Sequence, residues 1–82
     1  MTNDEELMLL FAMRYAIGRR TYAPVLVCEQ IMKKWKHIES KNLFIRDLEY
    51  EFKINERAEG YIGDKCDHMQ WMVLLEFMKG NR

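Results

Sequence analysis

The chain has 82 residues, of which 49% are hydrophobic and 32% are charged, and its formal net charge is zero. This composition predicts one small folded domain spanning residues 1–82, and it excludes both a disordered chain and a dedicated, strongly basic nucleic-acid-binding protein. We expect a cytoplasmic protein, because the longest apolar run, Leu7–Met13, is far shorter than the ~20 residues that cross a bilayer and the acidic N-terminus is unlike a secretory leader.

The first predicted helix covers residues 2–17. Thr2 and Glu5 have the spacing of a capping box, and three successive acids occupy the positive end of the helix dipole. Gly18 is the expected stop, because glycine readily adopts the left-handed conformation that ends helices. From Leu7 onward almost every residue is apolar, so this helix needs cover on nearly all its sides.

The second predicted helix covers residues 24–38. Pro24 suits its first turn, where the missing N–H has no helical partner. Apolar residues recur at helical spacing along it: Val27, Cys28, Ile31, Met32, Trp35 and Ile38. Most charged residues of this segment fall on the other side, so we expect one face, including Trp35, to lie in the core.

The third predicted helix covers residues 41–59 and follows a cap at Ser40 or Asn42. Its expected core residues are Ile45, Leu48 and Phe52, with Phe44 alongside. Glu49 and Lys53 are four residues apart in the favourable order, which predicts an ion pair on the helix surface.

The fourth predicted helix begins at an Asp64 cap, runs to about Lys79 and stops at Gly80. Between Met69 and Met78 only two residues are polar, so this helix is also apolar over most of its circumference.

Together these elements predict an all-α, single-domain bundle of four short helices, two of which have little polar surface. Either the first and fourth helices form a central antiparallel pair, or they extend an apolar patch that a partner covers. Seven methionines fit the second arrangement, because flexible thioethers suit adaptable interfaces. We therefore expect docking of a partner, or homo-oligomerisation, through the first or the fourth helix.

Cysteine and histidine residues do not indicate a metal site. Cys66 and His68 are potential ligands, and Cys28 and His37 could join them in space, but the chain has no CxxC or HxxxH pair. In a reducing cytosol both cysteines are expected to be reduced thiols rather than a disulfide. We expect neither a metal nor a cofactor.

No catalytic arrangement is indicated. Ser40 is the only serine and has the position of a helix cap, so a serine nucleophile is not indicated. The glycines are not arranged as a phosphate-binding loop, and a domain of this size has little room for an enclosed substrate site. We expect a protein that is not an enzyme.

Positive charge is concentrated between residues 14 and 37, where six basic residues stand against one acid. Arg19, Arg20 and Tyr22 lie in the predicted loop between the first two helices, and the Lys33–Lys36 segment ends the second. Such residues can bind phosphates and stack on bases, although lysines at a helix end also favour the dipole without any ligand. Nucleic-acid binding therefore stays open as an alternative function.

Two stretches of the sequence carry a recognisable pattern. Residues 9–31, LLFAMRYAIGRRTYAPVLVCEQI, join an apolar helix ending in RYAIGR to a Thr-Tyr turn and a valine-containing helix, and residues 63–78 add an aspartate with a tryptophan four residues later. Over about half the chain, this pattern resembles small phage and prophage proteins of Gram-positive bacteria. The matching residues are Arg14, Tyr15, Ala16, Gly18, Arg19, Thr21, Tyr22, Val27, Asp67 and Trp71.

The resemblance implies an accessory phage protein that binds and inhibits a host protein, such as a CRISPR-type defence nuclease, without catalysis. Two surfaces are then candidates for binding the partner. They are the basic loop with Arg19, Arg20 and Tyr22, and the acidic face of the third helix with Asp47, Glu49, Glu51 and Glu56. The acidic face could imitate a nucleic-acid backbone, but the interspersed Arg46, Lys53 and Arg57 argue against imitation. An assembly or scaffold component is a third class.

Overall fold

Four α-helices and one short 3₁₀ turn make up the part of the chain that this computed structural model describes. Its backbone covers residues 2–17, 23–58 and 65–82, and its side chains cover residues 2–17, 24–54 and 68–82. The elements are α1 (Asn3–Ala16), α2 (Ala23–Lys34), η1 (Trp35–His37), α3 (Lys41–Ala58) and α4 (Lys65–Gly80). No strand occurs within these ranges, so the predicted all-α fold of four helices is confirmed.

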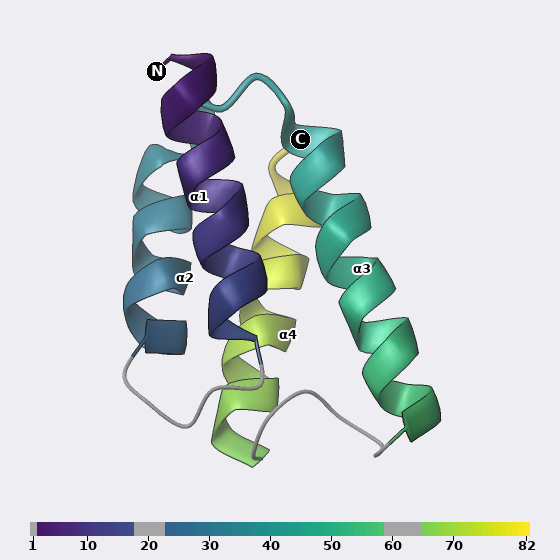
Figure 1. Ribbon diagram of the computed structural model, residues 1–82. Coiled ribbons are helices and arrows are strands. Elements are labelled where there is room, and N and C mark those ends of the chain that lie inside the picture. The colour runs from purple at the N-terminus through teal and green to yellow at the C-terminus, as the bar shows by residue number, and fades with distance from the viewer. Residues whose placement is uncertain (1, 18–22, 59–64) are drawn as a thin grey trace.

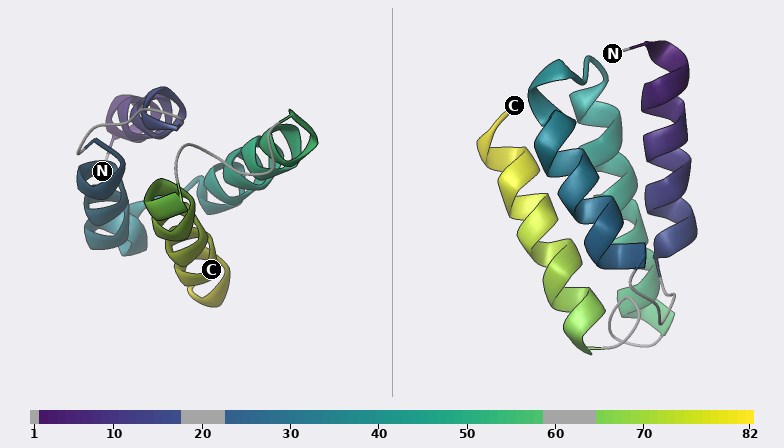
Figure 2. Two further views of the ribbon diagram at one scale, coloured as in Figure 1. Left: turned by 90° about the horizontal axis from the view of Figure 1, so that it is seen from below. Right: turned by 90° about the vertical axis from the view of Figure 1, so that its left-hand side faces the viewer.

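The helices alternate in direction, with α1 and α3 running one way and α2 and α4 the other (Figure 1). α2 packs against both α1 and α4, and α3 packs against α4, which gives the spatial order α1, α2, α4, α3 (Figure 2). The central pair is therefore α2 with α4, and these two helices are parallel. The alternative in which the first and fourth helices form a central antiparallel pair is wrong.

α1 begins as the capping pattern predicts. The Thr2 side chain accepts a hydrogen bond from the Glu5 backbone N–H at 3.2 Å, which satisfies one of the unpaired N–H groups of the first turn. At the other end, the N–H of Ile17 donates to the carbonyl of Met13 at 3.2 Å. The predicted stop, Gly18, lies outside the described residues.

α2 ends earlier than the predicted boundary at residue 38. The chain tightens into η1, where the Ile38 N–H donates to the Trp35 carbonyl at 3.0 Å, and Ile38 then takes an extended conformation. The next N–H, of Glu39, donates to the carboxylate of Glu6 on α1 instead of to a helical carbonyl. The boundary lies at Lys34 because the chain changes there to 3₁₀ hydrogen bonding, and the hydrogen bond from Glu39 to Glu6 then ties the segment after η1 to α1.

α3 begins where a Ser40 cap predicts it. The Ser40 carbonyl accepts hydrogen bonds from the N–H groups of Leu43 and Phe44 at 3.1 and 3.3 Å, which places Ser40 at the N-cap position. The described part of the helix runs to Ala58, and the predicted boundary at residue 59 lies outside the described residues. The predicted Asp64 cap of α4 lies outside the described residues.

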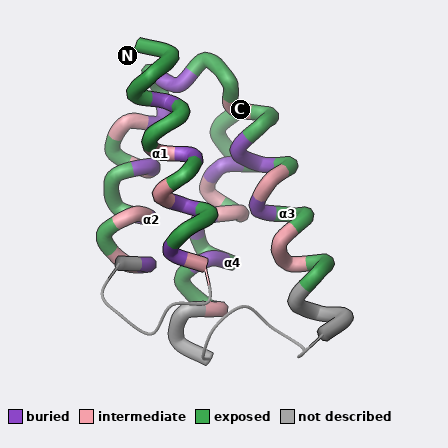
Figure 3. The backbone as a smooth tube through the Cα atoms, in the orientation of Figure 1, coloured by how far each residue is buried: buried purple, intermediate pink, exposed green. Residues whose placement is uncertain are grey.

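Buried residues occur on all four helices (Figure 3), and their side chains form one cluster. Its buried members are Leu10, Met13, Ala16, Cys28, Ile31, Trp35, Ile38, Phe44, Ile45, Leu48, Trp71, Leu74 and Met78. Trp35 is 3% exposed, which confirms its predicted core position, and its ring meets that of Phe44 edge-on with centroids 6.3 Å apart. Glu6 is also buried, although its sequence position predicts only a surface acid at the helix dipole.

Replacing Trp71, which is fully buried, tests the core. We expect Trp71→Ala to lower the free energy of unfolding by about 3–5 kcal/mol, because the cavity left by the indole cannot close completely. Trp71→Phe is the control: it keeps an aromatic ring and removes an indole N–H that has no hydrogen-bond partner, so its loss should stay below ~2 kcal/mol. Urea unfolding followed by circular dichroism measures both, and an unchanged transition for Trp71→Ala would contradict the core position.

Replacing Glu6 tests the hydrogen bond that joins α1 to the start of α3. We expect Glu6→Ala to cost about 1–3 kcal/mol of stability, because the Glu39 N–H loses its acceptor. Glu6→Gln keeps an acceptor oxygen and should lose less. Asp4→Ala removes an exposed acid from the same turn and reports the dipole contribution alone. Equal losses in Glu6→Ala and Asp4→Ala would show that the hydrogen bond contributes nothing.

Candidate partner-binding surfaces

The predicted basic loop cannot be placed. Arg19, Arg20 and Tyr22 lie outside the described residues, so their role in binding stays a prediction.

The acids predicted to form one face of α3 lie on different sides of it. Asp47 pairs with Arg14 of α1, whose Nη2 and Nε lie 2.6 and 2.7 Å from Asp47 Oδ2. Glu49, two residues on and so nearly opposite on the helix, pairs with Lys79 of α4 at 3.1 Å. The predicted pairing of Glu49 with Lys53 is therefore wrong, because the cation of a neighbouring helix takes that carboxylate.

Of the remaining two acids, only Glu51 has a described side chain. Glu51 is half-buried and lies four residues after Asp47, on the same side of α3. Glu56 belongs to α3, but its side chain lies outside the described part. Two of the four predicted acids are thus engaged with cations on two different helices, so the described part of α3 presents no continuous anionic face that could imitate a nucleic-acid backbone.

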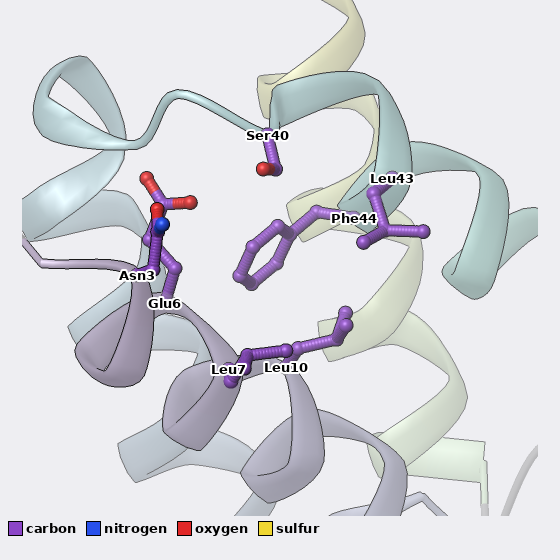
Figure 4. Close-up of a pocket in the computed structure, with 7 residues that line it drawn as sticks. All are labelled: Asn3, Glu6, Leu7, Leu10, Ser40, Leu43 and Phe44. Atoms are coloured by element: carbon purple, nitrogen blue, oxygen red, sulfur yellow. The ribbon is translucent and has the colours of Figure 1, made fainter.

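A pocket of about 300 Å³ lies between the N-terminal halves of α1 and α3 (Figure 4). We call it the α1–α3 groove, and its lining residues are Asn3, Glu6, Leu7, Leu10, Ser40, Leu43 and Phe44. Leu10 and Phe44 are buried and form the apolar floor, whereas Leu7 and Leu43 at the rim are 45% and 41% exposed. The groove thus presents an apolar interior with polar groups at one end.

Apolar side chains continue from the groove along the outer surface of α1. Leu7, Met8, Phe11 and Tyr15 are all exposed, Met8 by 71% and Phe11 by 56%. At 100° per residue these four side chains share one side of the helix, roughly opposite the buried residues of α1. We call this set the α1 outer face.

The same pattern appears on α3. Leu43, Tyr50 and Ile54 are exposed and fall in one line with Asp47 at spacings of three and four residues. Because Asp47 is bound to Arg14 of α1, this line lies on the side of α3 toward α1. The ion pair therefore crosses between two apolar helix surfaces, and Arg14 also lies 5.7 Å from the centroid of the Phe11 ring.

A second, separate apolar face lies on α4. Met69, Met72 and Val73 are exposed on one side of the helix, while Trp71, Leu74 and Met78 on the other side are buried. Apolar surface is therefore exposed on both α1 and α4, the two helices that are apolar on nearly all sides. This is the outward-facing apolar patch of the second expected arrangement, and the partner that would cover it stays a prediction.

Trp35 does not serve as a stacking platform for bases. It is buried, and its indole N–H donates to the Asn81 carbonyl at 2.7 Å. Beside it lies an open hollow of about 440 Å³, which we call the basic hollow. Its lining residues are Met32, Lys33, Trp35, Lys36, Lys41, Phe77, Asn81 and Arg82. The predicted Lys33–Lys36 segment thus meets two further cations, Lys41 and Arg82, that sequence reasoning missed because they lie far apart in the chain.

Within the described ranges, no three histidine, cysteine or acidic side chains are grouped so as to hold a metal ion. The side chain of Cys66 lies outside the described residues, so a site that combines it with His68 is not tested. Cys28 is buried, and its Sγ lies 3.9 Å from the Gln70 carbonyl oxygen. None of the helices in the described residues has both the length and the apolarity to cross a bilayer.

We expect the ion pair between Arg14 and Asp47 to position α1 relative to α3 beside the groove, and to contribute little to the free energy of unfolding. A double-mutant cycle with Arg14→Ala and Asp47→Ala is expected to give a coupling energy below ~1 kcal/mol, because the Arg14 side chain is 45% exposed and water and salt screen the pair. The measurement is chemical denaturation of the four proteins. A coupling well above that value would mean that the ion pair, and not the apolar floor, holds α1 to α3.

Comparison with known proteins gives no relative. No protein-family model matches the chain, and neither a curated protein nor a solved structure matches it. The likeness to small phage proteins consequently rests on the sequence pattern alone and stays a prediction. What the chain binds has to be argued from its own surfaces.

Proposed function

We propose that this protein is a non-catalytic, phage-encoded inhibitor that binds a host protein through the α1–α3 groove and the adjoining α1 outer face. The observation that carries the proposal is the exposure of Leu7, Met8, Phe11 and Tyr15 on the side of α1 opposite its buried residues. A surface helix ordinarily buries one apolar stripe and shows polar residues to water. A contiguous apolar surface on a small domain is typical of a binding site.

The composition of this surface supports protein binding. Methionine, phenylalanine and tyrosine are enriched in protein interfaces, and a pocket with an apolar floor can receive an anchor residue from the partner. Leu10 and Phe44 supply that floor. The polar end of the groove, with Asn3 and Ser40, can fix the orientation of the bound segment.

We propose an amphipathic helix as the segment of the partner that docks. Two helices that run in the same direction beside a groove favour a third helix laid along them, with apolar anchors at spacings of three and four residues. Asp4 and Glu5 are exposed at the start of α1, so a basic residue on the partner would meet complementary charge there.

The class of partner comes from the sequence pattern. The resemblance to phage and prophage proteins implies a target in the host cytoplasm, and a bacterial defence enzyme such as a CRISPR-type nuclease is the proposed one. Since Asp47 and Glu49 are paired within the chain, inhibition would proceed by apolar docking rather than by imitation of nucleic acid.

A second candidate function is nucleic-acid binding or regulation, which the basic hollow favours. It would use Lys33–Lys36 together with the predicted loop residues Arg19 and Arg20. A salt series separates the two functions: phosphate-driven affinity falls steeply with salt, whereas an apolar protein interface responds little.

Capture from a Gram-positive host lysate tests the proposal, with nuclease added to remove partners held by nucleic acid. The test protein carries Leu7→Gln and Phe11→Gln, and the matched control carries Met69→Gln and Met72→Gln on the exposed face of α4. We expect one host protein to bind the wild type and the control, and the groove variant to bind it at least ~30-fold more weakly, as anchor residues imply. Thermal melting should show both variants folded, because the replaced side chains are largely exposed.

Other results would redirect the proposal. Equal capture by both variants would remove the α1–α3 groove as the site. Loss of binding only in the α4 variant would assign the site to α4. If the protein captured only itself, light scattering of the same variants would show whether α1 or α4 forms a homo-oligomer, and a scaffold role would replace inhibition.

A further inference from the structure

The basic hollow gathers positive charge from four separate elements. Lys33 belongs to α2, Lys36 to η1 and Lys41 to α3, and Arg82 follows α4. No acidic side chain lines the hollow. Among the described residues, no ion pair joins Lys33, Lys36 or Arg82 to a carboxylate. Four cationic side chains and no acidic side chain therefore line the hollow.

The floor of the hollow is built from fixed contacts. The Trp35 indole N–H donates to the Asn81 carbonyl at 2.7 Å, and the Asn81 side-chain amide donates to the Phe77 carbonyl at 2.8 Å. Lys41 lies over the Trp35 ring, 5.6 Å from its centroid, and donates to the Ile38 carbonyl. These contacts hold the segment after α4 against η1, so the arrangement of cations is part of the fold.

The helix dipoles offset only part of this positive charge. The C-terminal ends of α2 and α4 both face the hollow, and each such end carries roughly half a negative charge. Together they offset about one of the four positive charges. The remaining positive charge would attract an anion into the hollow.

We propose that the basic hollow is a phosphate-binding site. Lysine ammonium groups act as compact charges on phosphate oxygens, and an arginine guanidinium can bind two of them at once. The volume of about 440 Å³ falls within the range of small-molecule sites, so a phosphate with an attached sugar fits as well as a free one. The phosphate belongs either to a free nucleotide or to the backbone of a nucleic acid. This site is separate from the α1–α3 groove and does not rest on the proposed inhibition.

Thermal unfolding of the full chain in potassium phosphate tests the site, against potassium chloride and sodium sulfate at matched ionic strength. The test variants are Lys36→Gln and Arg82→Gln, and the control is Lys53→Gln, an exposed lysine of α3 outside the hollow. At phosphate concentrations tenfold above Kd, we expect the Tm of the wild type and the control to rise by roughly 5–10 °C over chloride. Each test variant should need about ten times more phosphate for the same rise.

The variants also report on the empty hollow. In low salt without phosphate, Lys36→Gln should melt at a higher temperature than the wild type, because one repelling charge is gone. A lower Tm would show that the lysine only neutralises the helix end, and it would overturn the proposal. An equal rise in all four proteins, whether in phosphate or in sulfate, would reveal a general co-solute effect and would also overturn it.

Two further probes identify the source of the phosphate. Adenosine monophosphate and a short labelled oligothymidylate are each titrated, and inorganic phosphate is added as the competitor. Binding of the nucleotide alone would assign a small-molecule site, whereas salt-sensitive binding of the oligonucleotide that phosphate displaces would assign a nucleic-acid backbone. Failure of both probes, together with inorganic phosphate, would overturn the proposal without affecting the α1–α3 groove.

Discussion

The hydrogen bond from the Glu39 N–H to the buried carboxylate of Glu6 determines how the two halves of the molecule meet. It ties the segment after η1 to α1, so that α3 starts beside α1. Because of the turn through η1, Phe44 reaches the groove next to Leu10, and Lys36 and Lys41 reach the hollow around Trp35. The two candidate sites lie on opposite sides of this turn.

Local sequence signals predicted the elements well, because they depend on neighbouring residues. The Thr2 cap, the four helices and the buried position of Trp35 follow from capping chemistry and helical periodicity. Pairing between helices has no such local signal. Since α1 and α4 are apolar on nearly all sides, periodicity could not say which side faces the core, and the parallel α2–α4 pair was not predicted.

The candidate sites were harder to predict than the fold for the same reason. Asp47 and Glu49 look alike in sequence, yet one pairs with Arg14 and the other with Lys79, because the partners come from helices on different sides of α3. Lys41 and Arg82 reach the basic hollow from far apart in the chain. Glu6 is one of three successive acids, and it differs from the other two because it lies on the buried side of α1.

The parallel pairing of α2 with α4 also governs the order in which the chain can fold. Cys28 and Gln70, which meet across this pair, are 42 residues apart in sequence, and all of α3 lies between them. Closing so long a loop costs conformational entropy before the contact returns any stability, so the core depends on non-local contacts that slow folding relative to a bundle of sequence neighbours. During synthesis, α2 keeps an uncovered apolar face until α4 has emerged, and a chaperone or an early partner could bind that face in the meantime.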